Sequence, residues 1–277
     1  MKNILVPIET HDLVTSMLET AVCLAGVSGG TVEGVALRLP QISVVGPDPV
    51  VTVTFPRAEQ EDMEILAAAR KIFDTYFASG SAGALTDGGR PRYRWRPLEP
   101  VDDASLGSLG RVYDITVVGR PHGGSIGPRM TTLEASLFES GRPILIAPVM
   151  PPKSIGERMV ISWNCSSESA RTVAYAMPLL AKAREVTVLT VEGATVPGPS
   201  GKELADCLAG HGIEARELTV LAGGRKPGAA ILEEAQRLGA DLLVKGAYTQ
   251  SRLKQMIFGG ATQHILAHTE LPVFMAH

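Results

Sequence analysis

Residues 241–276 read DLLVKGAYTQSRLKQMIFGGATQHILAHTELPVFMA, and this stretch indicates the fold class. Its two solid apolar runs, residues 241–246 and 272–276, have the length of buried strands. The segment between them opens as a loop of mixed polar and apolar residues and continues with helical spacing over residues 260–268. Strands that are buried on both faces and joined by a helix are typical of a parallel sheet, because a parallel connection needs a crossover. The pattern predicts an α/β protein.

The chain repeats this order of elements. Residues 114–119 (DITVVG) match 241–246 (DLLVKG), and residues 3–9 (NILVPIE) match 158–164 (RMVISWN). Residue 3 matches 158 and residue 114 matches 241, so the offset falls from 155 to 127 and the first half carries the extra residues. The Pro- and Val-rich residues 40–56 account for much of this difference and predict a long excursion or an edge hairpin. Two copies indicate a duplication rather than a solenoid, which needs more repeats.

We therefore expect two tandem Rossmann-like domains, residues 1–150 and 156–277, joined by a Pro-rich linker. Each domain would be an open five-stranded parallel sheet with helices on both faces. Residues 79–90, rich in Gly, Ser and Ala, are expected to form a loop. The other strands are predicted at residues 31–39, 92–98, 143–149, 186–191 and 217–221, and the other helices at 12–27, 58–77, 102–112, 132–139, 167–182, 201–211 and 229–238.

The composition excludes several protein classes. The 277 residues contain 26 Lys and Arg against 29 Asp and Glu, so the formal net charge of −3 gives no attraction to nucleic acid or to anionic lipid. No apolar stretch approaches the ~20 residues of a membrane span, and the first residues lack a secretory pattern. The three cysteines form no C-x-x-C pair. We expect a cytoplasmic protein without a membrane, nucleic-acid or disulfide component.

Glycines mark the candidate binding segment of the second half. Gly246 ends the strand at residues 241–246, and Gly259 and Gly260 open the following helix. Free backbone N–H groups and the positive end of the helix dipole suit a phosphate there, and the Thr262 hydroxyl adds a donor. The alternative interpretation is that these glycines are only turn residues between a strand and a helix.

This segment is similar to the nucleotide loop of universal stress proteins, which has the pattern G-x2-G-x9-G-[S/T]. Gly246 and Gly259 fall on its first and third glycines, while Thr249 stands at the second glycine and Gly260 at the Ser/Thr position. The resemblance extends over essentially the whole chain, including the ESGRP and HTELP segments before the last strand of each half. It implies two adenine nucleotide α-hydrolase-like domains.

The resemblance implies that the second half binds an adenine nucleotide, ATP or AMP, with Mg²⁺ accompanying ATP. Asn164 stands where the family has an aspartate that contacts the nucleotide, and Val191 falls where the family lines its adenine pocket. The Thr249 side chain and the missing hydroxyl at Gly260 depart from the pattern. They leave open a scaffold, or a binding protein for a non-nucleotide ligand. The other nucleotide-binding residues that the resemblance implies are Ser162, Trp163, Gly246, Gly259, Ala261 and Thr262.

The first half departs further from the same pattern. Gly119 ends its fourth strand, but Met130 falls where the phosphate-binding glycine is expected, and Glu9 stands at the aspartate position. We expect this half to be structural, with a degenerate nucleotide site. Glu9 is also the strand-end acid that an enzyme of the nucleotide α-hydrolase type would use to hold a metal, which is the weakest of the alternatives.

The leading hypothesis is a stress-response regulatory protein that binds an adenine nucleotide in its second half. No residue stands out as a general base, so we expect at most slow ATP hydrolysis. His264 and His268 have a spacing that two metal-binding imidazoles can share, but a solvated helix end explains them better and no metal site is expected. Cys165, at a strand-to-helix turn, is a candidate reactive thiol.

By analogy with tandem stress proteins, residues 143–149 and 271–276 lie at sheet edges and pair antiparallel across a pseudo-two-fold axis. One chain then forms an intramolecular pseudo-dimer, in which each apolar edge covers the other. A further homodimer of the whole chain stays open.

Overall fold

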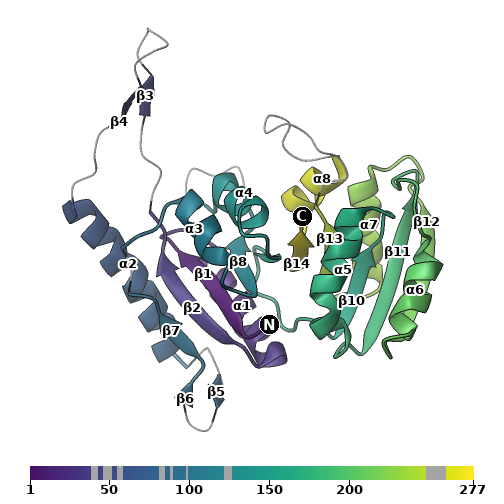
Figure 1. Cartoon of the computed structure of the whole chain (residues 1–277), viewed down its shortest axis with the longest axis horizontal. Coiled ribbons are helices and arrows are strands. Elements are labelled where there is room, and N and C mark those ends of the chain that lie inside the picture. Colours follow the sequence, from purple (N-terminus) through teal and green to yellow (C-terminus); the bar gives the residue numbers. More distant parts are fainter. Residues whose placement is uncertain are drawn as a thin grey trace.

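In a computed structural model of the protein, ten strands form one continuous sheet with helices around it (Figure 1). The structure describes residues 1–38, 43–45, 52–54, 59–80, 85–87, 90–97, 99–121, 127–247 and 260–277. The strands of the first half are β1 (Asn3–Ile8), β2 (Thr31–Ala36), β7 (Tyr93–Trp95), β8 (Ile115–Gly119) and β9 (Ile144–Ala147). Those of the second half are β10 (Arg158–Ser162), β11 (Glu185–Glu192), β12 (Ala215–Leu221), β13 (Leu242–Gly246) and β14 (Val273–Ala276).

The strand order is β12-β11-β10-β13-β14-β9-β8-β1-β2-β7, so each half has the order 3-2-1-4-5 and its strands are parallel. The predicted α/β class with five-stranded parallel sheets is confirmed. The two halves meet at β14 and β9, which pair antiparallel with Phe274 opposite Leu145. Both of these side chains are fully buried. The resemblance to tandem stress proteins implied this antiparallel pairing, which removes two apolar sheet edges at once.

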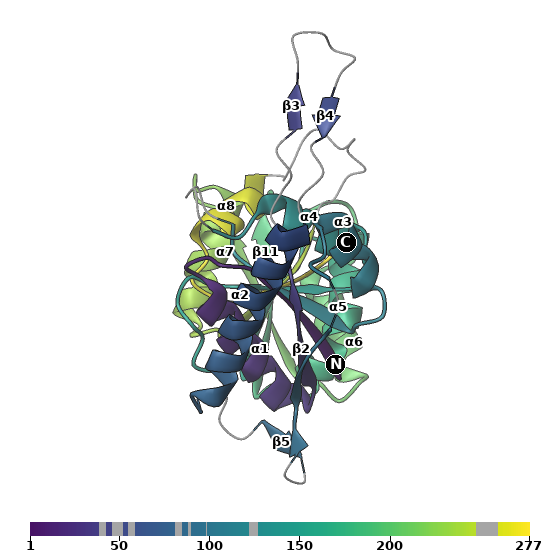
Figure 2. The same cartoon turned by 90° about the vertical axis from the view of Figure 1, so that its left-hand side faces the viewer.

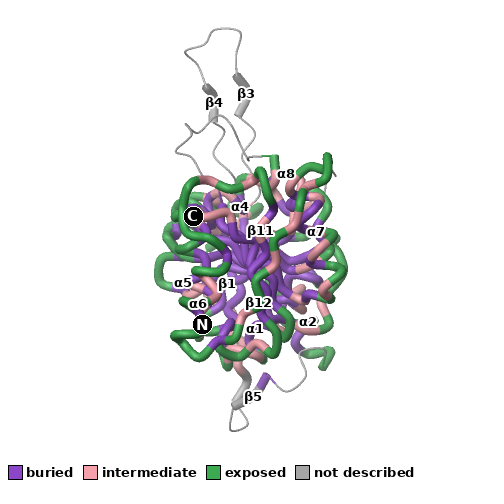
Figure 3. Tube along the Cα trace, turned by 90° about the vertical axis from the view of Figure 1, so that its right-hand side faces the viewer, coloured by how far each residue is buried: buried purple, intermediate pink, exposed green. Residues whose placement is uncertain are grey.

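Helices cover both faces of the sheet (Figure 2). One apolar core gathers side chains from α1, α2, α5 and α6, and a second core gathers side chains from α4, α7 and α8. Both cores extend across the two halves, and buried residues follow the sheet while exposed residues lie on the outer surfaces (Figure 3). The described helices are α1 (Val14–Ser28), α2 (Glu59–Ala78), α3 (Asp103–Gly110), α4 (Met130–Phe138), α5 (Ser167–Leu180), α6 (Gly201–Ala209), α7 (Pro227–Arg237) and α8 (Gly260–His268).

The extra residues of the first half form short ladders outside the ten-stranded sheet, and an excursion or edge hairpin was predicted at residues 40–56. Within residues 40–56, β3 (Ser43–Val45) and β4 (Thr52–Thr54) pair antiparallel as a separate two-stranded ladder. The predicted loop at residues 79–90 includes β5 (Thr86–Asp87), which pairs with β6 (Arg90–Pro91). The predicted strand 92–98 shortens to β7, an edge strand that pairs only with β2 among the described residues. An edge strand has one hydrogen-bonded neighbour, so fewer of its residues are held in the sheet.

Equivalent hydrogen bonds recur in the two halves. The Asp114 carboxylate accepts from the backbone N–H of Asn3 at 3.0 Å, and the Asp241 carboxylate accepts from the backbone N–H of Arg158 at 2.9 Å. In both halves the acidic residue precedes the fourth strand and fixes the start of the first. None of the described helices has the length and apolar character that crossing a bilayer requires.

Candidate functional site

A small pocket lies at the carboxyl ends of β10, β11 and β13, where the strand order of the second half reverses. Ligands of open parallel sheets bind at such switch points. The pocket has a volume of about 40 Å³, and we refer to it as the strand-end pocket. Its lining residues are Ser162, Trp163, Asn164, Val191, Ala194, Ile231, Lys245 and Ala261.

Lys245 is the charged residue of the strand-end pocket. It pairs in register with Ser162 on the neighbouring strand, and only 8% of its surface is exposed. Its ammonium group donates to the backbone oxygen of Gly246 at 2.8 Å and to Thr262 Oγ1 at 3.0 Å. Burial lowers the pKa of Lys245 to about 8. Both acceptors are neutral, and no carboxylate of the described residues forms an ion pair with Lys245.

The sequence analysis did not select Lys245, although a signal was present. The matching strand of the first half reads DITVVG against DLLVKG, so Val118 occupies the position of Lys245. A lysine in a fully buried strand, at a position that its own repeat fills with valine, is a conflict between residue type and environment. Such conflicts gather at functional sites.

The N-terminus of α8 lies beside this lysine. Thr262, in the first turn, is buried and accepts the hydrogen bond from Lys245, so its oxygen points toward the sheet. Gly260 is exposed, and a Cβ added there would have no atom within 4 Å. The first N–H groups of a helix have no intrahelical acceptor, so they can donate to an anion. The predicted site residues Thr249 and Gly259 lie outside the described residues.

Asn164 holds the start of α5. Its side-chain oxygen accepts hydrogen bonds from the Ser166 hydroxyl at 2.9 Å and from the Ser169 hydroxyl. The amide oxygen that could accept from a nucleoside is therefore engaged within the protein. Trp163 borders the pocket, but its indole belongs to the core on the other face and donates to the backbone oxygen of Pro199 at 2.8 Å.

Gly246 is required by the packing of α5. A Cβ at Gly246 would lie 2.5 Å from the backbone nitrogen of Ser169. The sequence analysis connected Gly246 with a close approach of a ligand, whereas the atoms that approach it belong to helix α5. The missing side chain thus has a structural reason.

Gly246→Ala is expected to lower the free energy of unfolding by about 2 kcal/mol, because the added methyl group overlaps backbone that cannot move freely. Urea unfolding without ligand measures this difference. Gly260→Ala is the matched control and should change stability little, since its Cβ enters open space. Equal effects of the two substitutions would contradict the packing role of Gly246.

Comparison with known proteins identifies the second half. Residues 157–277 match the family model described as the universal stress protein family. The similarity to that family concerns this part of the chain. A stretch of 49 residues is 39% identical to the stress response protein NhaX of Bacillus subtilis (strain 168), covering 18% of this chain and 30% of that relative.

The whole chain has the fold of solved universal stress proteins. A universal stress protein from Archaeoglobus fulgidus DSM 4304 superposes with a TM-score of 0.70 at 16% identity, covering 100% of this chain and 98% of that one. A protein of unknown function from Pseudomonas aeruginosa PAO1 gives a TM-score of 0.57 at 13% identity, covering 100% and 92%. At these identities the likeness shows the fold, including the first half that the family model does not match.

The corresponding corner of the first half is filled by the protein's own charges. Arg129, which precedes Met130 at the start of α4, donates to the Glu9 carboxylate at 2.7 Å and to the Asp103 carboxylate at 3.0 Å. Asp103 also accepts from the hydroxyls of Thr131 and Thr132, each at 2.7 Å. Glu9 stands at the position that Asn164 has in the second half.

Burial raises the pKa of Glu9 to about 6, although Arg129 acts to lower this pKa. The Asp103 carboxylate adds to the increase. Among the described residues, Arg129 is thus paired with two carboxylates of the chain itself. That the first half is structural stays a prediction.

The paired histidines of α8 and the Cys165 thiol are the remaining candidates. The His264 and His268 rings stack with centroids 4.2 Å apart. No group of three or more His, Cys, Asp or Glu is placed to hold a metal within the described ranges. Burial and the nearby Glu203 raise the pKa of the Cys165 thiol, which is opposite to the activation that a reactive thiol needs.

Proposed function

We propose that the universal stress protein domain, residues 156–277, binds an adenine nucleotide, ATP or AMP, or a related phosphate-bearing ligand as part of a stress response. Residues 1–150 would form the partner domain, with a degenerate site. The anionic end of the ligand would occupy the strand-end pocket and the N-terminus of α8.

The observation that carries this proposal is the buried charge of Lys245. A lysine ammonium has three N–H donors, and here two of them reach neutral oxygens. A buried cation without a counter-charge destabilises the folded protein. An anion held by the first N–H groups of α8 would supply the missing charge and accept the remaining donor.

The other residues would then contact different parts of the ligand. Gly259 and Gly260 would leave the backbone of the helix start accessible to phosphate oxygens. Ser162, next to Lys245, would contribute a hydroxyl, while Asn164 and Val191 would lie toward the nucleoside. The lining residues of the pocket include no carboxylate, so Mg²⁺ bound with ATP would be held by phosphate oxygens and water. They also include no histidine or acid to serve as a general base, so we expect at most slow hydrolysis.

A second candidate is a binding protein for a small anion that is not a nucleotide. The volume of about 40 Å³ favours it, because each water needs roughly 10–15 Å³ by the same measure and the described pocket holds only a few. The engagement of the Asn164 oxygen by Ser166 and Ser169 points the same way.

Thermal unfolding with ATP, AMP, adenosine or inorganic phosphate separates the two candidates. A nucleotide-binding domain is stabilised by about 2.7 kcal/mol when ATP or AMP is at 100-fold excess over its Kd, and phosphate stabilises it less. A small-anion site responds to phosphate as well as to the nucleotides. Lys153→Met, a variant of an exposed lysine, is the control for the added salt and charge. No stabilisation by any of these compounds at millimolar concentration would contradict both candidates.

A further inference from the structure

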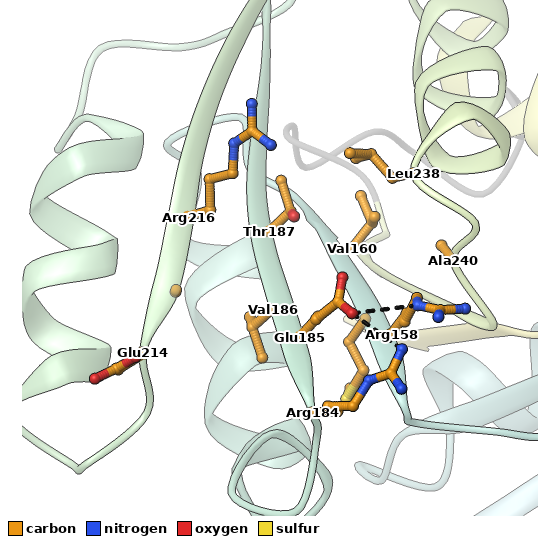
Figure 4. Close-up of a pocket in the computed structure, with 12 residues that line it drawn as sticks. Arg158, Val160, Arg184, Glu185, Val186, Thr187, Glu214, Arg216, Leu238 and Ala240 are labelled. Atoms are coloured by element: carbon orange, nitrogen blue, oxygen red, sulfur yellow. Dashed lines mark hydrogen bonds and ion pairs between the residues drawn. The ribbon is translucent and has the colours of Figure 1, made fainter.

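A second and larger pocket lies at the opposite ends of the strands of the same sheet, at the amino ends of β10, β11 and β12 (Figure 4). Its volume is about 420 Å³, which is in the range of small-molecule sites. We call it the amino-end pocket. Thr187 of β11, Val160 of β10 and Ala240 before β13 line it together with Arg216 of the edge strand β12.

The first half contains an equivalent region at β1, β2 and β7, which we call the first-half corner. In β1, β2 and β7, Leu5 pairs with Glu33 and Glu33 pairs with Arg94. In β10, β11 and β12, Val160 pairs with Thr187 and Thr187 pairs with Arg216. Register therefore equates Glu33 with Thr187 and Arg94 with Arg216.

A tyrosine completes the corner of the first half. Tyr113 directly precedes Asp114, and Ala240 directly precedes Asp241, whose carboxylates make the equivalent hydrogen bonds to the first strands. Tyr113 and Ala240 are therefore also equivalent. Tyr113 is buried in a core with Leu5.

In the first half this corner holds an internal ion pair and an aromatic ring. The buried Glu33 carboxylate accepts from Arg94 Nε at 2.9 Å and from a terminal guanidinium nitrogen of Arg94 at 2.7 Å. Arg96 donates to the Tyr113 hydroxyl at 3.1 Å and lies 3.6 Å from the other Glu33 oxygen. Burial and the Glu33 carboxylate raise the pKa of Tyr113, which keeps the hydroxyl neutral.

The second half retains the arginine and lacks its partners. Threonine replaces the carboxylate of Glu33, and alanine replaces the ring of Tyr113. Arg216 forms no ion pair with any described residue, whereas Arg158 and Arg184 share the carboxylate of Glu185 at 3.4 and 3.0 Å. The apolar residues Val160, Leu238 and Ala240 line one side of the pocket (Figure 4). Ala240 stands at the position that Tyr113 has in the other repeat.

We propose that the amino-end pocket binds a small aromatic carboxylate, whose carboxylate accepts hydrogen bonds from Arg216 and whose ring packs against Val160 and Ala240. The first half shows the chemistry that fits this corner, because there a glutamate carboxylate and a phenol ring of the chain itself fill it. Glu185 and Glu214 at the rim disfavour ligands with several negative charges. This site is independent of the nucleotide proposed for the strand-end pocket.

Titration of the whole protein with 4-hydroxyphenylacetate, followed by backbone amide NMR, tests the proposal. We expect shifts at Thr187 and Ala240 and none at Ser162 and Lys245. Acetate lacks the ring and 4-methylphenol lacks the carboxylate, so each should bind at least about tenfold more weakly. Arg216→Gln should weaken binding at least about tenfold, since it removes a charge-assisted hydrogen bond.

A double variant, Thr187→Glu with Ala240→Tyr, recreates the first-half occupants and should abolish binding while the spectrum stays folded. Arg171→Gln changes an exposed arginine outside the pocket and is the control, with unchanged affinity expected. The proposal is overturned if the probe does not bind, if its shifts map to the strand-end pocket, or if the double variant binds as the wild type does. Equal affinities of the Arg216→Gln and Arg171→Gln variants would also overturn it.

Discussion

Replacing Lys245 by methionine is expected to stabilise the protein by about 3 kcal/mol at pH 7 and to abolish anion binding at the strand-end pocket. Methionine fits the length of the lysine side chain and brings no charge into the core. The gain arises because burial lowers the pKa of Lys245 to about 8 from 10.5, so the folded state disfavours the proton that the unfolded chain carries. The lost hydrogen bonds to Gly246 and Thr262 reduce the gain.

The effect depends on pH in a defined direction. Between pH 8 and 10.5 the unfolded chain binds more protons at Lys245 than the folded protein, so wild-type stability rises with pH across this window. Below pH 8 the full penalty of the buried charge is present, and above 10.5 it is absent. The stability difference between Lys245→Met and wild type should therefore shrink as the pH rises from 8 to 10.5.

Urea unfolding of both proteins at pH 7 and pH 10 measures this difference. Lys153→Met is the matched control, because Lys153 is exposed and its change should leave stability unaltered at both values. A Lys245→Met variant that is less stable than wild type at pH 7, or that binds ATP and phosphate like wild type, contradicts the role given to Lys245.

Replacing Arg129 by methionine is expected to destabilise the first half by about 3 kcal/mol at pH 8, because the buried Glu9 carboxylate loses its counter-charge. Arg129 contacts Glu9 at 2.7 Å, and both side chains are largely buried. Asp103 keeps its hydrogen bonds from Thr131 and Thr132, so the cost is concentrated at Glu9.

The cost of Arg129→Met should fall below pH 6. Burial raises the pKa of Glu9 from 4.5 to about 6, so between these values the folded protein binds more protons than the unfolded chain. Wild-type stability at this group therefore decreases as the pH rises from 4.5 to 6. At pH 5 Glu9 is mostly neutral and has little ion pairing with Arg129 to lose.

A double-mutant cycle at pH 8 isolates the pair. Glu9→Gln alone should cost less than Arg129→Met, since Arg129 retains Asp103 as a partner. Adding Glu9→Gln to Arg129→Met should restore most of the lost stability, because no unpaired buried charge remains. Additive losses, or a pH-independent effect of Arg129→Met, would show that Arg129 does not compensate the buried charge of Glu9.

Much of the fold could be predicted from the sequence, because buried parallel strands are short solid apolar runs and the helices between them have a different period. The repeat reinforced each assignment, since DITVVG and DLLVKG had to occupy the same place. The edges were less predictable. The predicted strand 92–98 lost residues at both ends in β7, where a single neighbouring strand decides how far pairing extends.

The candidate site was predicted in part. Ser162, Trp163, Asn164, Val191 and Ala261, which the family resemblance implied, line the strand-end pocket. That they bind a nucleotide stays a prediction. The orientation of the side chains depends on packing that sequence does not show, so the indole of Trp163 and the oxygen of Asn164 proved to serve the protein itself. Lys245 does not interrupt the apolar pattern of its strand, and it stands out only against the other repeat, where Val118 occupies the equivalent position.

Calorimetric titration with ATP at pH 8, in two buffers of different ionisation enthalpy, tests the central claim that Lys245 compensates a bound anion. The pKa of Lys245 is near 8, so this lysine is about half protonated at pH 8. A phosphate beside it raises this pKa, so binding should be accompanied by the uptake of at most about half a proton. The phosphate groups are fully ionised at this pH and take up none. The predicted result is a difference in binding heat between the two buffers that corresponds to this proton uptake. Binding without proton uptake, or no binding, would contradict the claim.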